Sequence, residues 1–272
     1  MRHARMGWRG SSAFYVGVEV NRGQGRVPEM RQTVMQRILI TGASRGLGLE
    51  FARCYLERGA RVFAGCRRPD TAQPLQALQA IDPQRLTVVP LDVADAASIL
   101  ASHAIVRSQV DGLDLLINNA GVYSARGSAG PEERLGELTF EDAMTVLRVN
   151  AVGPLLVAQQ YLDLLRGGTR PKLVNLSSGY GSVSANTGGF PYYYSASKAA
   201  LNMFMRSLAA EAKRWGIITV LLDPGWVRTD MGGPGAPLTP RRSAEGMIHV
   251  IDALAPRQNG RFLSWQGREQ DW

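Results

Sequence analysis

The stretch RILITGASRGLG, residues 37–48, decides the fold. Its first part, Arg37–Thr41, is a short apolar run typical of a buried strand, and an amphipathic pattern typical of a helix follows from Leu47. The glycines between them permit a tight turn, while free N–H groups at the start of a helix attract anions. Glycine occupies 30 of 272 positions, so the turn alone could be an ordinary loop. Its strand and helix context favours a pyrophosphate-binding turn.

Short apolar runs and longer amphipathic stretches alternate along the rest of the chain, which is typical of βαβ units. We expect strands at Arg37–Thr41, Arg61–Cys66, Leu86–Pro90, Leu113–Asn118, Lys172–Leu176, Ile217–Asp223 and Arg261–Trp265. We expect helices at Leu47–Arg58, Ala94–Val110, Thr139–Arg166, Tyr192–Trp215 and Arg241–Ala255. Consecutive apolar positions within the strands indicate helices on both faces of the sheet. The sequence therefore predicts an α/β fold, a single doubly wound Rossmann-type domain over residues 35–272 with a seven-stranded, mainly parallel sheet.

Residues 1–34 break this pattern because they are rich in glycine and arginine. We expect them to be disordered or to precede the true start, with Met30 or Met35 as the initiator. A transit peptide is the alternative, since such leaders are rich in arginine and poor in acids. A protein starting at Met35 is expected to fold and react like the full chain.

Charge and cysteine usage exclude several function classes. Residues 1–34 hold six arginines and two glutamates, so half of the formal net charge of +8 lies there. No nucleic-acid motif accompanies the remaining charge, and nucleic-acid binding is not expected. Two cysteines, twelve positions apart, and three scattered histidines fit neither a disulfide framework nor a metal site. No apolar run approaches the roughly 20 residues of a membrane span, so we expect a cytoplasmic protein without structural metal.

Tyr194 and Lys198 are four positions apart on a predicted helix, so both side chains emerge on one face and can reach one ligand. A surface tyrosine–lysine pair is the alternative. A nearby ammonium favours the phenolate, and lowering a phenol pKa by roughly three units takes about 4 kcal/mol. We therefore expect Lys198 to tune Tyr194 as a general acid and base. Tyr192 and Tyr193 have no such partner and are interpreted as packing or pocket-wall residues.

The glycine spacing G-x-x-x-G-x-G resembles the short-chain dehydrogenase/reductase family more than other Rossmann groups. Further family marks follow in order along residues 35–272: Leu91-Asp92-Val93, Asn118-Asn119-Ala120-Gly121, Asn150, Ser177-Ser178, Tyr194-Ser195-Ala196-Ser197-Lys198, Pro224-Gly225 and Thr229. Within the family, the runs 148–151 and 197–202 resemble the compact C-factor/sniffer-like carbonyl reductases. The resemblance implies cofactor contacts at Gly42, Ser44, Arg45, Gly46, Leu47, Gly48, Arg67, Asp92, Val93, Asn119, Ala120, Gly121, Tyr194, Lys198, Pro224, Gly225, Val227 and Thr229.

The resemblance also implies catalytic roles. Lys198 would hydrogen-bond the nicotinamide ribose, and Ser178, rather than Ser177, would hydrogen-bond the substrate oxygen. Asn150 would hold a water in a proton relay, although a helical asparagine can equally be structural.

Arginines stand where NAD-specific sites place an acidic residue, at the end of the second strand. Here the sequence reads Cys66-Arg67-Arg68, and Arg45 in the glycine turn offers another guanidinium. A 2′-phosphate would find charge-assisted partners there, which predicts NADP(H). The alternative is a solvated arginine pair.

The sequence thus predicts an NADP(H)-dependent oxidoreductase acting on a small, apolar carbonyl or alcohol substrate. The wall of its pocket is expected to include Tyr123, Tyr180, Phe190 and Trp226, with a mobile Gly/Pro-rich loop between residues 230 and 241. The alternative is an NADP(H)-binding sensor or signalling protein with incidental turnover. The chain is compatible with a homo-oligomer, and neither substrate identity nor direction follows from the sequence.

Overall fold

The computed structural model describes residues 35–125, 133–189 and 191–272. The predictions for residues 1–34, and the assignment of Phe190 to the pocket wall, lie outside this part of the chain.

Seven parallel strands form one sheet in the order β3-β2-β1-β4-β5-β6-β7. The strands are β1 (Arg37–Thr41), β2 (Arg61–Cys66), β3 (Leu86–Pro90), β4 (Leu115–Asn118), β5 (Lys172–Leu176), β6 (Ile218–Asp223) and β7 (Phe262–Ser264). The chain builds β1, β2 and β3 outward in one direction and then returns to place β4 on the other side of β1. Parallel sheets bind ligands at such a reversal, outside the carboxyl ends of the strands.

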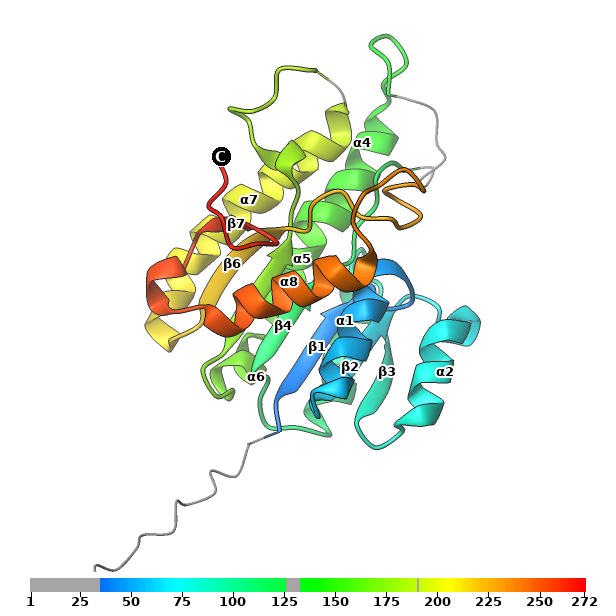
Figure 1. The fold of residues 1–272 in the computed structure, drawn as a ribbon, viewed down its shortest axis with the longest axis vertical. Helices are drawn as coiled ribbons and strands as arrows, with labels where there is room; N and C mark the ends of the chain where they lie inside the picture. Colours follow the sequence, from blue (N-terminus) through cyan, green and yellow to red (C-terminus); the bar gives the residue numbers. More distant parts are fainter. Residues whose placement is uncertain (1–34, 126–132, 190) are drawn as a thin grey trace, which may run out of the picture. The chain divides into compact units, whose positions relative to one another are not determined.

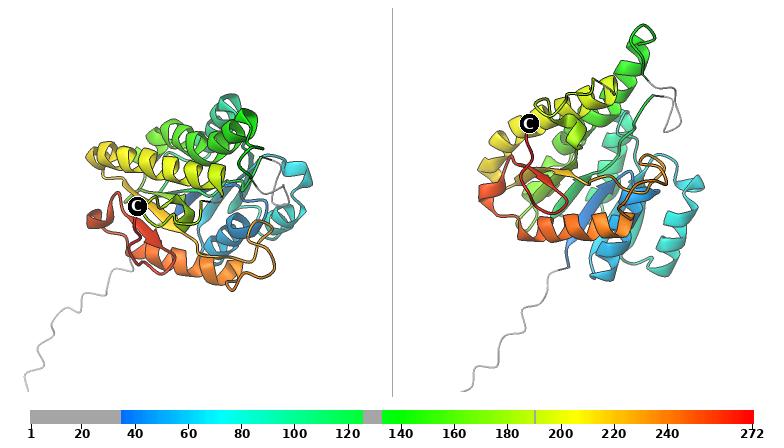
Figure 2. Two further views of the ribbon diagram at one scale, coloured as in Figure 1. Left: turned by 90° about the horizontal axis from the view of Figure 1, so that it is seen from above. Right: turned by 45° about the horizontal axis from the view of Figure 1, so that its top comes forward.

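Helices cover both faces of the sheet, as Figures 1 and 2 show. One layer holds α1 (Gly46–Glu57), α2 (Gln73–Ile81) and α8 (Pro240–Ala253). The other holds α3 (Ala96–Arg107), α5 (Gly153–Gln160), α6 (Leu162–Arg166) and α7 (Tyr192–Ala212), with α4 (Phe140–Leu147) preceding α5. Apolar side chains pack into one cluster on each face, and Leu115, Leu116 and Ile117 of β4 are fully buried between the layers. The predicted doubly wound fold is therefore confirmed.

Strand bounds match the sequence predictions closely, whereas one predicted helix is divided in two places, the second at Tyr161 between α5 and α6, and one helix was not predicted. The stretch Thr139–Arg166, expected as one helix, is interrupted by a π-helical segment η2 (Arg148–Val152), in which the Gly153 N–H reaches back to the Arg148 carbonyl. Pro154 follows, and its missing N–H prevents a regular α-helix at this point. Helix α2 was not predicted because its apolar stripe is short, with Leu75 its one buried residue.

Residues 35–125, 133–189 and 191–272 hold neither a membrane-spanning helix nor a metal-binding cluster. No helix in these ranges is long and apolar enough to cross a membrane. No group of three or more His, Cys, Asp or Glu side chains in them could hold a metal ion, and both cysteines are free and buried.

Gly48 is expected to be a stability requirement of the turn that follows β1. A Cβ atom there would lie far inside contact distance of the Gly42 carbonyl oxygen and 2.5 Å from the Asn119 side-chain nitrogen. We expect Gly48→Ala to lower the free energy of unfolding by about 1–3 kcal/mol, because backbone atoms would have to move. Thermal or denaturant unfolding without ligand measures this. Gly188→Ala, at a position with nothing within 4 Å, is the matched control; equal stability of both variants would contradict the expectation.

Candidate active site

The turn after β1 is fastened to the end of β4 by side-chain hydrogen bonds. The Thr41 hydroxyl oxygen accepts the N–H groups of Asn119 and Ala120, each at 3.0 Å. In return, the Asn119 amide donates to the carbonyls of Thr41 at 2.8 Å and Gly42 at 3.0 Å. These bonds fix the backbone of the glycine turn at the strand reversal, beside β4.

Glycine is required in this turn for close approach and for backbone conformation. Gly42 has φ +67°, and a Cβ on it would lie 2.8 Å from the Ala120 Cα. Gly46 has φ +56°, and a Cβ on it would lie 3.4 Å from the Thr229 side chain. The glycine turn, the segment after β4 and the segment after β6 therefore meet at one edge of the sheet. Helix α1 begins at the end of this turn with no side-chain cap, so its first N–H groups suit an anion such as a pyrophosphate; we call the turn and these N–H groups the cradle.

Tyr194 and Lys198 lie together at this edge, on α7. Tyr194 is 8% exposed and Lys198 is 5% exposed. The Lys198 Nζ donates to the Leu176 carbonyl of β5 at 2.8 Å and lies 5.7 Å from the centre of the Tyr194 ring. A Cβ on Gly121 would be 3.8 Å from the same Nζ, so the lysine faces the segment after β4 as well.

The acidity of Tyr194 differs from the sequence expectation. Burial raises its pKa to about 12, an effect that the hydrogen bond with Ser178 opposes and the Asp223 carboxylate reinforces. The expected lowering of this pKa was wrong, because loss of hydration, which disfavours the phenolate, is the largest influence on it. Burial also lowers the pKa of Lys198 to about 8, and Asp223 partly counteracts that fall.

The two serines after β5 have different surroundings. Ser177 is buried and donates to Asn202 Oδ1 at 2.6 Å, which is a structural bond. Ser178 is half-buried, lies within hydrogen-bonding reach of Tyr194, and accepts the Tyr180 N–H at 3.2 Å. Of the two, Ser178 is therefore the serine that lies beside Tyr194.

Asn150 lies in η2 and is fully buried. Its Oδ1 accepts the Val122 N–H at 2.8 Å, while its Nδ2 donates to the Val122 carbonyl at 2.7 Å and to Ser197 Oγ at 3.0 Å. Both amide protons are thus used within the protein. These bonds tie the segment after β4 to α7, and the water-holding role expected for Asn150 stays a prediction.

Two arginines that the sequence predicts as cofactor contacts, Arg67 and Arg45, are exposed. Arg67 is exposed directly after β2, and the Ala43 N–H donates to the Gly65 carbonyl at 2.9 Å, which holds the glycine turn against that strand. Arg45 is also exposed and pairs with Asp230 at 2.6 Å. Solvent-exposed ion pairs contribute little free energy, so an anionic ligand can compete for Arg45.

The remaining predicted cofactor positions follow β1, β3 and β6. After β3, Asp92 Oδ1 accepts the Ala94 N–H at 2.9 Å, and Val93 is buried. Ser44 and Leu47 belong to the glycine turn and the first turn of α1. After β6, the Pro224 carbonyl accepts the Ser243 hydroxyl at 2.7 Å, and further predicted positions of that segment are Gly225, with φ +75°, and Val227, which bridges to Leu238.

Aromatic rings line the approach to Tyr194. The ring centre of Tyr123 lies 5.1 Å from that of Tyr194, and Tyr180 lies 6.1 Å away, edge-on. Trp226 is exposed on the loop after β6 and donates to the Gly232 carbonyl at 2.7 Å. The Tyr193 hydroxyl donates to the Thr139 carbonyl at 2.9 Å, which agrees with a packing role.

Asp223 is a residue of this edge that sequence reasoning missed. It ends β6 and acts electrostatically on both Tyr194 and Lys198. A signal was present, because a carboxylate at the carboxyl end of a predicted parallel strand lies where ligands bind.

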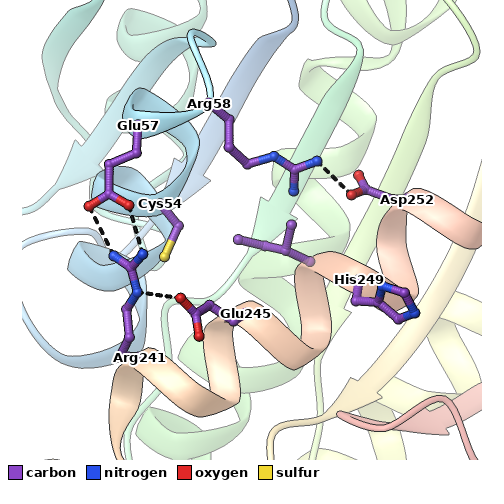
Figure 3. A pocket seen from close by; sticks show the side chains of 8 residues that line it. Cys54, Glu57, Arg58, Arg241, Glu245, His249 and Asp252 are labelled. Carbon is purple, nitrogen blue, oxygen red and sulfur yellow. Dashed lines mark hydrogen bonds and ion pairs between the residues drawn. The ribbon is translucent and has the colours of Figure 1, made fainter.

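A separate cavity of about 310 Å³ lies between α1 and α8, away from the predicted residues (Figure 3). Arg241 pairs there with Glu57 at 2.7 Å and with Glu245 at 2.6 Å, and Arg58 pairs with Asp252 at 2.6 Å. Burial raises the pKa of the Cys54 thiol to about 11, so it is not a reactive thiolate. These charges already have partners, and the cluster serves to hold α1 against α8.

Comparisons with known proteins agree with this arrangement. The family model for short chain dehydrogenase matches residues 36–236. The C-signal protein of Myxococcus xanthus is 45% identical over 160 residues, which is 59% of this chain and 93% of that protein. Two solved structures cover 88% of this chain: NADPH-bound carbonyl reductase from chicken fatty liver (36% identity, TM-score 0.80, 99% of that chain) and carbonyl reductase Sniffer of D. melanogaster (31%, 0.81, 100%). The chain therefore belongs to the short-chain dehydrogenase/reductase family of oxidoreductases.

Proposed function

We propose that this oxidoreductase uses NADP(H) to interconvert a carbonyl group and an alcohol on a small, apolar substrate, with Tyr194 as the general acid and base. The observation that carries the proposal is the buried Tyr194–Lys198 pair beside the glycine cradle. This reaction needs a proton donor and a dinucleotide-binding turn at the same edge of the sheet.

The residues of this edge fit NADP(H). The cradle of Gly42, Gly46 and Gly48 suits the pyrophosphate. Arg67 and Arg45 suit a 2′-phosphate, since arginines rather than a carboxylate directly follow β2. Lys198 would hold the nicotinamide ribose. The bound cofactor would supply or accept the hydride. Among the similar structures, the chicken carbonyl reductase is NADPH-bound, which supports the same choice here.

Proton transfer follows from the state of Tyr194. With a pKa near 12 the phenol is protonated at neutral pH, so it can donate to a carbonyl oxygen that Ser178 also contacts. The C=O bond becomes C–O–H as hydride adds to carbon and the phenol proton moves to oxygen. Lys198, if charged, favours the phenolate left behind, which solvent then reprotonates.

The aromatic approach indicates the substrate class. The rings of Tyr123 and Tyr180 lie beside Tyr194. Such rings offer an apolar surface to a substrate. Flat, apolar aldehydes or ketones fit such a surface.

The role of Tyr194 is tested by Tyr194→Phe, which keeps the ring and removes the transferable proton. We expect kcat for NADPH-dependent carbonyl reduction to fall about 100-fold to 10,000-fold, since general acid catalysis contributes that much, while the Kd for NADPH changes little. Tyr192→Phe removes a hydroxyl from the neighbouring exposed side chain and should leave kcat unchanged. Turnover by Tyr194→Phe at the parent's rate would rule out Tyr194 as the acid.

Cofactor choice is tested by Arg67→Ala and Arg45→Ala. Each lost charge-assisted bond is worth about 1.5–3 kcal/mol, so we expect the Kd for NADPH to rise tenfold to a hundredfold, with the Kd for NADH nearly constant. Fluorescence titration with both cofactors measures this. Arg257→Ala, an exposed arginine in the turn after α8, is the control. A parent that prefers NADH, or variants that weaken both cofactors equally, would overturn the assignment.

A further inference from the structure

We propose that Asp223 is a positioning residue for proton transfer, which keeps Lys198 charged and Tyr194 protonated and so sets the upper pH limit for carbonyl reduction. The effect on carbonyl reduction rests on the proposed function. The effect of Asp223 on the charge of Lys198 depends on the folded chain alone.

The Asp223 carboxylate lies at the carboxyl end of β6. Leu176 of β5 pairs in register with Leu222 of β6, and Asp223 is the next residue along. The Leu176 carbonyl is the hydrogen-bond acceptor of the Lys198 ammonium, at 2.8 Å. Asp223 is therefore one residue beyond the point where the ammonium is anchored.

Backbone N–H groups hold the carboxylate in place. Its Oδ1 accepts the Gly225 N–H at 2.9 Å, and the Gly179 N–H is its other backbone donor. A Cβ on Gly179 would lie 3.6 Å from Oδ2, so the carboxylate packs against the turn that follows Ser178. One side chain thus links the turn bearing the catalytic serine to the Pro224–Gly225 segment.

Titratable side chains of α7 and of the turn after β5 lie near Asp223. Lys198 and Tyr194 of α7 both interact electrostatically with Asp223, and Tyr180 lies in the same turn as Gly179. From β7 its register partner is Ser264, which is uncharged. The negative charge attracts the ammonium and opposes formation of the phenolate, so it raises the pKa of both Lys198 and Tyr194. Burial raises the pKa of Asp223 itself, and Lys198 lowers it.

Loss of the Asp223 charge shifts the pH dependence of reduction in the same direction whether Tyr194 or Lys198 limits the rate. Reduction needs a protonated Tyr194, so the rate falls as pH rises through the pKa of the limiting group. Removing the negative charge lowers the pKa of Tyr194 and also that of Lys198. The alkaline limb of kcat/KM for reduction is therefore expected to move to lower pH in Asp223→Asn, by about one unit.

Lys198 can be titrated directly, because the chain holds three lysines, Lys172, Lys198 and Lys213. We would label lysine Cε with ¹³C, assign the three signals with Lys172→Arg and Lys213→Arg, and follow them by NMR against pH without cofactor. We expect a Lys198 midpoint near 8 in the parent and about one pH unit lower in Asp223→Asn. Asp252→Asn removes the same charge on α8, beside Arg58, and should leave the Lys198 midpoint unchanged.

An unchanged Lys198 midpoint in Asp223→Asn would overturn the proposal, as would an equal shift in Asp252→Asn. Asn keeps an oxygen that can accept one of the two N–H groups, so the fold should be retained. If Asp223→Asn does not fold, Asp223→Ser is a second neutral variant, with the same expected shift of the Lys198 midpoint. Asp223→Glu keeps the charge and should keep the parent midpoint. A shifted midpoint without any carbonyl reductase activity would support the charge linkage and contradict the proposed function, so the two failures are distinguishable.

Discussion

The buried ammonium of Lys198 is the constraint on which the candidate active site depends. A lysine at 5% exposure loses most of its hydration, and such a charge persists only with close polar partners. The structure supplies the Leu176 carbonyl at 2.8 Å and the Asp223 carboxylate nearby. Both partners sit at the carboxyl ends of neighbouring strands, so the register of β5 with β6 determines the charge available beside Tyr194.

The sheet brings the other components to the same edge. The Thr41 hydroxyl joins the glycine turn to β4, and Asn150 joins the segment after β4 to α7. The glycine turn, the segment after β4 and the helix that carries Tyr194 are therefore joined by short side-chain hydrogen bonds. This edge is where a parallel α/β sheet leaves backbone groups available to a ligand.

Much of this was predictable because strong local patterns specify it. The apolar runs of Arg37–Thr41 and Lys172–Leu176 gave strand bounds that the structure reproduces, and the Tyr194/Lys198 spacing placed both side chains on one helix face. Helix α2 escaped prediction because its buried stripe is so short. The raised pKa of Tyr194 and the part of Asp223 in it depend on burial and on contacts between distant strands, which spacing along the sequence does not contain.

The account is tested most directly by a crystal structure of the protein with NADP⁺. It predicts the pyrophosphate against the turn Gly42–Gly48, the 2′-phosphate at Arg67 or Arg45, and the nicotinamide ribose at the Lys198 ammonium, with Tyr194 and Ser178 facing the nicotinamide. A cofactor bound at another edge of the sheet, or one whose nicotinamide lies away from Tyr194, would contradict it.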